Sequence, residues 1–194
     1  MWVVWIVFVV GYMNTISEEY RAVLQETHKG SGARGWGNTG SVKYLKPTLN
    51  LMERYNVTEM LDYGAGWGGM KAKMAELKPT VIVHEYEPAR PEVAMPPEPC
   101  DFVVCHDVLE HIEPEYLDAV LLDLKRVINK FGYFSVCTVP ALKKLSDGRN
   151  AHLIVEEFEW WLVKLAPHFH IRQARFYNSR QVSGDILVEK RCVR

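Results

Sequence analysis

The sequence predicts an α/β fold: a doubly wound, mostly parallel sheet with an antiparallel C-terminal edge strand and a helical N-terminal cap. Two observations predict it. From residue 57 onward, short apolar runs alternate with amphipathic stretches, as strands and helices do in parallel sheets. The first of these runs ends in closely spaced glycines, at the kind of strand end where such folds bind ligands. A chain of 194 residues fits one domain of about 100–200 residues.

The N-terminal part predicts two helices separated by a loop. Residues 15–28 are amphipathic, and Ser17 stands where a helix cap is expected. Residues 29–40 hold five of the 13 glycines, a composition typical of a loop. A second helix is expected over about 41–55, where apolar residues recur at helical spacing. Together these segments form the predicted cap.

The remainder alternates strands and helices. The stretch 88–100 is rich in proline, which excludes a regular helix there. The last two apolar runs are joined by a short connection around 178–184, which favours an antiparallel pair. In chain order we expect strands over 57–63, 80–85, 101–105, 133–139, 170–177 and 185–190, and helices over 71–77, 115–129 and 156–165.

Composition excludes several classes of protein. Lys and Arg number 23 against 24 Asp and Glu, so the formal charge of -1 gives no strong signal for nucleic acid. A hydrophobic share of 48% excludes a predominantly disordered chain. The four cysteines lack C-x-x-C spacing, and we interpret them as buried, reduced thiols of a cytoplasmic protein.

Residues 1–12, MWVVWIVFVVGY, form an uncharged apolar run. The run is shorter than the roughly 20 residues of a membrane-spanning helix, so a membrane protein is not expected. Three interpretations stay open: a misassigned start that should be Met13, a short anchor, or a packed strand or helix. The predicted organisation is therefore an extension over 1–12 and a single domain over 13–194, with its cap over about 13–55.

The strongest functional signal is LDYGAGWGG at residues 61–69. Glycines at alternate positions let the backbone turn sharply and approach a ligand closely. Glu87 ends the next strand, about 20 residues beyond the glycines, where a carboxylate can accept hydrogen bonds from both ribose hydroxyls of a nucleoside. Glu85 competes for this role, and we favour Glu87 because the strand should end just before Pro88.

The spacing D-x-G-x-G-x-G differs from the dinucleotide pattern G-x-G-x-x-G. It resembles motif I of class I S-adenosylmethionine-dependent methyltransferases. DFVVCHDVLEHI at 101–112 resembles the motif IV region of small-molecule and RNA O-methyltransferases, and 127–134 resembles the family's turn into its fifth strand. The resemblance covers about 45–190. It implies a Rossmann-like fold, S-adenosylmethionine as cofactor, and methyl transfer to an O or N atom of a small molecule or nucleotide.

By position, the resemblance implies a cofactor site made of Asp62, Gly64, Gly66, Gly68, Glu87 and Asp107. Asp62 would lie near the methionine amino group, Glu87 would hold the ribose, and Asp107 would lie near the methionine moiety or the acceptor. The family often has an adenine-contacting acid on an additional strand after Glu87. This chain has a proline-rich bridge there, so the adenine pocket is either abbreviated or built by loop residues such as Met95 and Cys100.

Three interpretations stay open for the acceptor side. His111 or His152 can act as a general base, since the reference pKa of histidine, about 6.5, lies near working pH. Alternatively, Asp107, Glu110, His111 and His152 bind a divalent metal; this resembles small-RNA 2′-O-methyltransferases, which use an E-x-x-E-H cluster and a later histidine. Finally, the Glu110-His111 pair merely starts a helix that begins at Asp107.

A narrower resemblance concerns residues 138–141 (TVPA), 147–152 (DGRNAH) and the Trp160-Trp161 pair. These segments resemble methyltransferases of tailed and marine bacteriophages, which would place the protein in a host cytoplasm. Two other functions compete with methyl transfer. One is an S-adenosylmethionine-binding protein without transferase activity, as a cofactor sink or assembly subunit. The other is an NAD-linked oxidoreductase, against which the glycine spacing argues.

Overall fold

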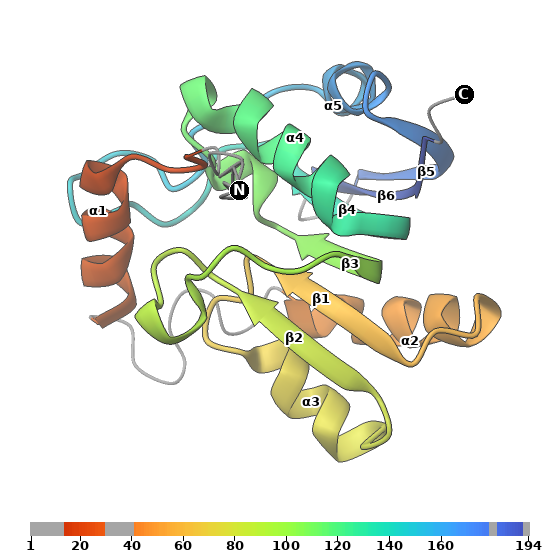
Figure 1. Ribbon diagram of the computed structural model, residues 1–194. Coiled ribbons are helices and arrows are strands. Elements are labelled where there is room, and N and C mark those ends of the chain that lie inside the picture. The colour runs from red at the N-terminus through yellow and green to blue at the C-terminus, as the bar shows by residue number, and fades with distance from the viewer. Residues whose placement is uncertain (1–13, 30–40, 179–181, 192–194) are drawn as a thin grey trace, which may run out of the picture.

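The computed structural model describes residues 14–29, 41–178 and 182–191. The expectations for residues 1–12 and for most of the glycine-rich loop lie outside these ranges. Within them the strands form one sheet in the order β2-β1-β3-β4-β6-β5 (Figure 1). The strands are β1 (Glu59–Tyr63), β2 (Ile82–Tyr86), β3 (Cys100–His106), β4 (Ile128–Cys137), β5 (Phe169–Asn178) and β6 (Val182–Lys190).

The sheet confirms the predicted fold class. β2, β1, β3 and β4 run parallel, whereas β6 pairs antiparallel with both β4 and β5. The C-terminal hairpin therefore places β5 at the edge and β6 inside the sheet. Tyr63 pairs with Tyr86, so β1 and β2 end side by side at their carboxyl ends.

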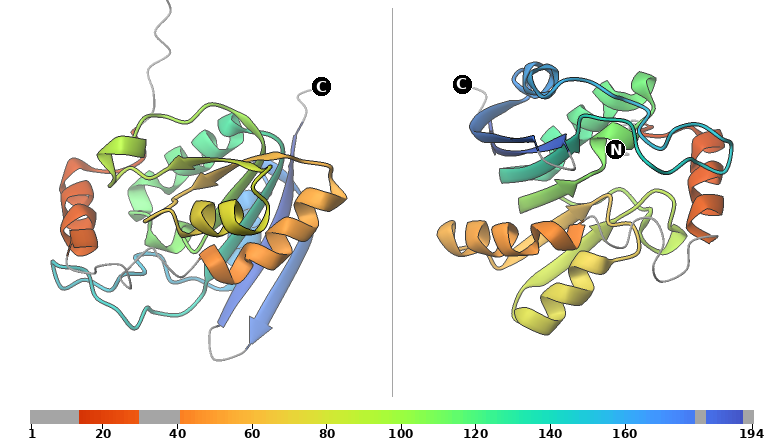
Figure 2. Two further views of the ribbon diagram at one scale, coloured as in Figure 1. Left: turned by 90° about the horizontal axis from the view of Figure 1, so that it is seen from below. Right: turned by 180° about the vertical axis from the view of Figure 1, so that it is seen from behind.

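Helices cover both faces of the sheet. α2 and α3 pack on one face, and α4 and α5 on the other (Figures 1 and 2). Alternate residues of β3 serve the two cores: Phe102 and Val104 face α2 and α3, whereas Val103 and Cys105 join the cluster under α4. The helices are α1 (Glu18–Lys29), α2 (Leu45–Arg54), α3 (Gly69–Leu77), α4 (Leu117–Val127) and α5 (Phe158–Leu165).

α1 belongs to neither layer. It stands beside the edge of the sheet at which β1 and β2 end, as the two orientations in Figures 1 and 2 show. Ser17 caps α1 as predicted, because the amide of Tyr20 donates to Ser17 Oγ at 2.9 Å. The second helix of the predicted N-terminal cap, α2, instead packs on a face of the sheet. Ser17 is itself held by Glu113, whose carboxylate accepts from the Ser17 hydroxyl at 2.7 Å and from its amide at 2.9 Å. This contact ties α1 to the segment that precedes α4.

β4 begins earlier than the predicted strand over 133–139. It starts at Ile128, directly after α4, and Ile128 already pairs with Cys100. The segment 127–134 resembles the family's turn into this strand, but Gly132 lies inside the strand. A Cβ there would stand 2.8 Å from Ile128 Cδ1 and 2.9 Å from the Phe134 ring, so this glycine permits close packing rather than a reversal of the chain.

The helix predicted to begin at Asp107 is wrong. Asp107 follows β3 with a left-handed φ of 53°, Glu110 and His111 lie in a short 3-10 turn, η4 (Leu109–His111), and α4 begins at Leu117. A second 3-10 turn, η5 (Pro114–Tyr116), leads into α4, because Pro114 can start a helix but cannot continue one. The carboxylates therefore do not share a helix face.

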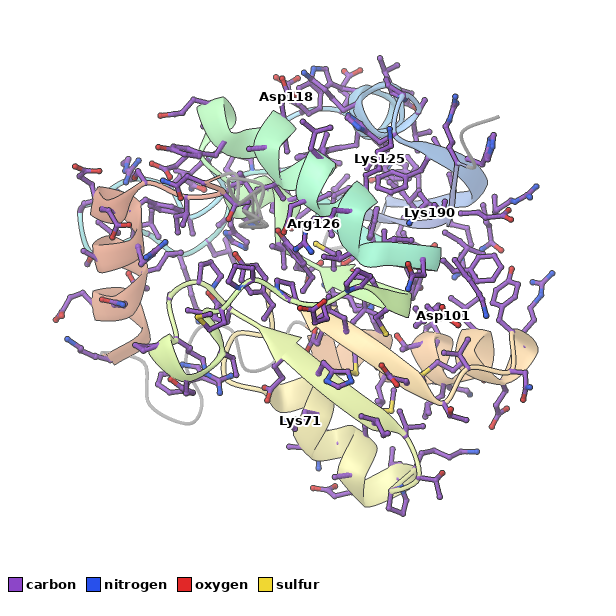
Figure 3. All side chains as sticks on the ribbon, viewed as in Figure 1. Lys71, Asp101, Asp118, Lys125, Arg126 and Lys190 are labelled. Carbon is purple, nitrogen blue, oxygen red and sulfur yellow. The ribbon has the colours of Figure 1, made fainter. Side chains whose placement is uncertain are left out.

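The proline-rich stretch forms a bridge instead of an additional strand. Among the described residues it contains one short turn, η3 (Pro91–Val93), between β2 and β3. Arg126 of α4, labelled in Figure 3, fastens it by donating to the carbonyl of Pro97 at 3.0 Å. Cys100 and Cys105 are buried and Cys137 is half-buried, all with free thiols as expected. In the described ranges, no helix has the length and apolar character of a membrane span.

Candidate active site

A cavity of about 470 Å³ opens at the carboxyl ends of the parallel strands. Its wall includes the glycine turn after β1, the start of the loop after β2, and residues 106–108 at the end of β3. The N-terminal cap contributes Tyr20 and its neighbours, and residues 137–143 contribute a further side. Segments from the whole length of the domain therefore meet at the position that the sequence predicted.

The glycine turn, residues 64–68, is fixed by its neighbours. The amides of Gly64 and Ala65 donate to the carbonyl of Tyr86 at 2.8 and 3.0 Å, which ties the end of β1 to the end of β2. Gly64 has φ of 82°, and a Cβ there would lie 2.4 Å from Val108 Cγ2. Both the backbone conformation and the space require glycine at this position.

The two competing glutamates point to different places. Glu85 pairs with Lys71 of α3 at 3.0 Å and with Arg90 at 3.2 Å, and it does not line the cavity (Lys71 is labelled in Figure 3). Glu87 lines the cavity, and its carboxylate accepts from the amides of Gly66 and Ala89, both at 3.1 Å. Of the two glutamates, Glu87 is the one that reaches the cavity.

Two predicted cofactor residues lie behind the turn rather than on the cavity wall. Gly68 is the N-cap of α3, and a Cβ there would lie 2.5 Å from Glu85 Oε1. Asp62 is 1% exposed, and its Oδ2 has no hydrogen-bond partner. Burial, reinforced by the charges of Glu85 and Glu87, raises the pKa of Asp62 to about 7. A cation bound at the turn would stabilise the ionised form of this carboxyl.

Asp107 lines the cavity in a setting that sequence reasoning missed. Its Oδ2 forms an ion pair with Lys43 Nζ at 2.7 Å, and its Oδ1 accepts from Tyr44 at 3.1 Å and from Ser135 at 2.8 Å. Lys43 and Tyr44 lie in a 3-10 turn, η2 (Ser41–Tyr44), at the start of the predicted second helix. No local pattern links them to Asp107, which is distant in the chain.

His111 and His152 meet on the cavity wall, with ring centroids 4.9 Å apart. Nδ1 of His111 lies 2.7 Å from the carbonyl of Ala151, and Nδ1 of His152 lies 2.6 Å from the carbonyl of Val139. Because a carbonyl only accepts, each Nδ1 carries the hydrogen, and in the neutral rings Nε2 carries the lone pair. We call these two residues the histidine pair.

Glu110 lies beside the histidine pair. It is fully buried; its Oε1 accepts from the amide of Cys137 at 2.9 Å, and its Oε2 has no hydrogen-bond partner. Burial raises the pKa of Glu110 to about 8, and the charge of Asp107 adds to this effect. Burial and the neighbouring His152 lower the pKa of His111 to about 4. Burial therefore favours the neutral form of both side chains.

Glu110, His111 and His152 each offer a ligand atom, and these atoms lie within 4.8 Å of one another. Asp107, predicted as a possible fourth ligand, does not join this group, since its carboxylate is bound to Lys43, Tyr44 and Ser135. Met95 and Cys100, considered for the adenine pocket, do not line the cavity: Met95 is 78% exposed, and Cys100 is buried at the start of β3.

Solved structures share this architecture. A Burkholderia thailandensis 1,6-didemethyltoxoflavin-N1-methyltransferase, with bound 1,6-didemethyltoxoflavin and S-adenosylhomocysteine, superposes with a TM-score of 0.61 over 89% of each chain at 18% identity. The chain has the fold of these methyltransferases. The N-methyltransferase NodS from Bradyrhizobium japonicum WM9, in complex with S-adenosylhomocysteine, gives a TM-score of 0.57 over 88% of this chain and 97% of NodS, at 11% identity.

The methyltransferase domain of bacterial CtHen1-C is a third neighbour, with a TM-score of 0.56 over 75% of this chain and 96% of that domain, at 13% identity. No family model and no curated protein matches the sequence. The methyltransferase fold is therefore evident from backbone arrangement at sequence identities below one in five. The chemistry of the site depends on which residues line the cavity.

Proposed function

We propose that the protein is an S-adenosylmethionine-dependent methyltransferase that transfers a methyl group to an oxygen or nitrogen atom of a small molecule or nucleotide. The observation that carries the proposal is one cavity lined both by the glycine turn with Glu87 and by the histidine pair. A nucleoside-binding end and a proton-accepting end thus face a common space. The methyltransferase fold, and the S-adenosylhomocysteine bound in two of its neighbours, support the cofactor assignment.

The residues at the glycine turn fit the cofactor. Gly64 and Gly66 present backbone without side chains to the cavity. Glu87 is held in place by two amides, and each of its oxygens keeps a further lone pair for a ribose hydroxyl. The unpartnered Oδ2 of buried Asp62, beneath the turn, offers a negative charge to a cationic group above it. Asp62 would act through this field or through a bridging water.

Methyl transfer from the cofactor's sulfonium is a direct displacement: the acceptor–carbon bond forms as the carbon–sulfur bond breaks, and S-adenosylhomocysteine leaves. The acceptor atom loses its proton in the process. In our proposal Nε2 of His152 takes that proton, because its Nδ1 hydrogen is already committed to Val139. Burial lowers the pKa of His111, so His111 serves as a neutral neighbour that orients the acceptor. Alignment of the acceptor atom with the methyl–sulfur bond inside the cavity supplies the remaining advantage.

A tritiated-methyl transfer assay on fractionated cell extract tests the function, with Gly66→Arg beside the wild type. An arginine side chain at Gly66 would fill the space that we assign to the cofactor. We expect labelled acceptor with the wild type only. Labelling that survives Gly66→Arg would refute the site. Calorimetric binding of S-adenosylhomocysteine without any labelled acceptor would favour the rival, a cofactor-binding protein without transferase activity.

The compact group of Glu110, His111 and His152 favours a second candidate for the acceptor side, a divalent metal site. Two imidazole nitrogens and a carboxylate suit zinc, iron or manganese. The carbonyls of Ala151 and Val139 accept from the Nδ1 atoms and orient the rings, as hydrogen bonds to metal-bound histidines do. The buried Oε2 of Glu110 lacks a partner, which fits a ligand position. When bound, a metal would lower the pKa of an acceptor hydroxyl and fix its place.

Titration of the metal-stripped protein with Co²⁺, followed by its visible absorption, tests this candidate without an activity assay. Glu110→Gln should weaken Co²⁺ binding by more than the roughly 10- to 100-fold that loss of a group hydrogen-bonded to a metal ligand costs, because it removes a charged ligand. Glu113→Gln is the matched control, because Glu113 lines the same cavity but lies outside the group. Turnover that is unaffected by EDTA would remove the metal and leave His152 as the base.

A further inference from the structure

A groove of about 310 Å³ lies between α2 and the C-terminal hairpin formed by β5 and β6. No described residue lines both this groove and the cavity of the candidate active site. The two spaces differ in charge. Among the described residues, four acidic side chains line the cavity, whereas the wall of the groove holds two arginines, one lysine and no acidic side chain. The methyl transfer proposed above makes no use of this groove.

The wall of the groove on the side of α2 is polar and positively charged. Lys46, Asn50 and Arg54 follow one another at intervals of four residues, so they share one face of the helix, and all three line the groove. Lys46 and Arg54 are exposed, and no ion pair joins either of them to another described residue. The guanidinium of Arg54 lies 5.6 Å from the centre of the Tyr55 ring, a contact that leaves its charge uncompensated. This wall therefore brings two uncompensated positive charges to the groove.

The wall on the side of β5 presents a guanidinium in a fixed orientation. Gln173 and Arg175 are alternate residues of β5, and both line the groove. Arg175 donates from Nε to Asp185 Oδ1 at 2.9 Å and from Nη2 to Asp185 Oδ2 at 2.8 Å. Asp185 is 3% exposed, and Tyr133 and Tyr177 donate to its Oδ2 at 3.0 and 2.8 Å. Two of the five N–H donors of the guanidinium are thus committed to a buried carboxylate, and the other three are available to a ligand.

The floor of the groove is apolar. Tyr133, Leu187 and Gln173 lie side by side across β4, β6 and β5, and the first two are buried. Leu51 of α2 adds a further apolar side chain to the lining. Tyr133 packs edge-to-face on His106, with ring centroids 4.9 Å apart, and His106 lines the cavity of the candidate active site. These two rings therefore stand between the groove and the cavity.

We propose that the groove is a second binding site and that its ligand is a small phosphorylated molecule. The planar fork of the Arg175 guanidinium matches two oxygens of a phosphate group. Lys46 and Arg54 supply two positive charges, which balance the two negative charges of a phosphate dianion. Asn50 and Gln173 offer amide groups to the uncharged part of the ligand. The site is independent of methyl transfer, because none of its described residues lines the cavity.

Size and charge favour a small phosphorylated ligand over a nucleic acid. A volume of about 310 Å³ lies within the range of small-molecule sites, which starts at roughly 300 Å³. Three cations line the described part of the groove, fewer than the roughly six to ten phosphate contacts with which proteins hold DNA. A ligand with a single carboxylate would leave one of the two uncompensated charges without a partner. A phosphate is therefore the better match.

Calorimetric titration with inorganic pyrophosphate tests the site. We expect a 1:1 complex, in which Lys46→Met and Arg54→Met each weaken binding roughly 5- to 30-fold, between the values of an exposed ion pair and of a hydrogen bond to a charged group. Both side chains are exposed, so both variants should keep the stability of the wild type in urea. Lys46→Arg, which keeps the charge, should retain most of the affinity. The side-chain amide resonances of Asn50 and Gln173 should shift on titration in the NMR spectrum.

Lys143→Met is the matched control, because Lys143 is also an exposed lysine but lines the cavity of the candidate active site. Its affinity for pyrophosphate should equal that of the wild type. A loss in Lys143→Met as large as that in Lys46→Met would place the anion in the cavity and overturn the inference. A wild type that binds no pyrophosphate would also overturn it. So would a single-stranded oligonucleotide that binds more tightly than pyrophosphate and depends on Lys46, because the groove would then serve a nucleic acid.

Discussion

The glycine turn and the histidine pair line the same cavity, but they are built in opposite ways. The turn comes from one continuous segment, and it presents backbone whose position Tyr86 and Val108 fix. The histidine pair comes from two segments separated by α4 and β4, and burial lowers the pKa of His111 and raises that of the neighbouring Glu110. The difference teaches that cofactor binding should be lost when the backbone of the turn is disturbed. The acceptor chemistry should be lost when a single ring or carboxyl group is changed.

The largest effect is expected from His152→Asn. The Asn amide can still donate to the carbonyl of Val139, but it has no basic nitrogen for the acceptor's proton. Loss of a general base lowers kcat roughly 10²- to 10⁴-fold. Affinity for S-adenosylhomocysteine should change less than about twofold, since this change spares the turn. Methyl transfer and calorimetry measure the two quantities.

His170→Asn serves as the control for that prediction, because His170 is an exposed residue of β5 that does not line the cavity. Its rate should equal that of the wild type. If His152→Asn lost cofactor affinity as strongly as it lost rate, the separation between the two sides of the cavity would be refuted.

Gly64→Ala tests the opposite side. Alanine would have to adopt the left-handed φ of 82° and would press its Cβ to 2.4 Å from Val108. Backbone strain and overpacking together should lower the free energy of unfolding by about 2–4 kcal/mol. Urea denaturation measures the loss. Gly148→Ala is the matched control, because Gly148 has a φ of 89° but no atom within 4 Å of the added carbon. This variant therefore measures the backbone strain without the steric clash.

Combining Gly64→Ala with Val108→Ala should recover the steric part of that loss. The double variant would then resemble Gly148→Ala. If Gly64→Ala were as mild as Gly148→Ala from the outset, the contact between the turn and Val108 would not matter to the cofactor side.

The glycine turn lies in one continuous segment and the acceptor side is assembled from distant segments, and this difference decides how far each could be predicted from the sequence. The fold class and the glycine turn followed by Glu87 could be predicted, because periodicity and a short glycine pattern carry them locally. The sequence also brought His111 and His152 forward as residues of one site. It could not supply the partners of Asp107: Lys43 and Tyr44 reach it through tertiary packing. The predicted helix at Asp107 failed because Pro114 delays α4 and leaves η4 in its place.

Glu110→Gln should change the pH dependence of stability. The pKa of Glu110 rises from 4.5 to about 8 on folding, so the folded protein keeps a proton that the unfolded chain releases. The stabilisation that Glu110 contributes is therefore fully present below about pH 4.5 and is lost as the pH rises toward 8. Between pH 5 and 7 this group should account for about 2 kcal/mol of unfolding free energy. Glutamine keeps the bond to Cys137 and cannot ionise, so its curve should be flatter.

The pKa of Asp62 is also raised, to about 7, so its ionisation likewise lowers the free energy of unfolding as the pH rises toward 7. The difference between wild type and Glu110→Gln, measured by urea denaturation at each pH, isolates Glu110 from it. Parallel curves for the two proteins would show that Glu110 ionises normally and that the acceptor side lacks the buried proton described here.

Ser17→Ala is expected to have the smallest effect, and it asks how the cap couples to the acceptor side. Ser17 caps α1 through Tyr20 and donates to Glu113, so its loss should cost about 1 kcal/mol of stability. Tyr20 also donates to the carbonyl of His111 at 2.8 Å, which connects α1 to the histidine pair and not to the turn. Hydrogen exchange should therefore quicken in α1, and KM for the acceptor should rise while affinity for S-adenosylhomocysteine stays constant. A loss confined to cofactor affinity would instead assign α1 to the other side of the cavity.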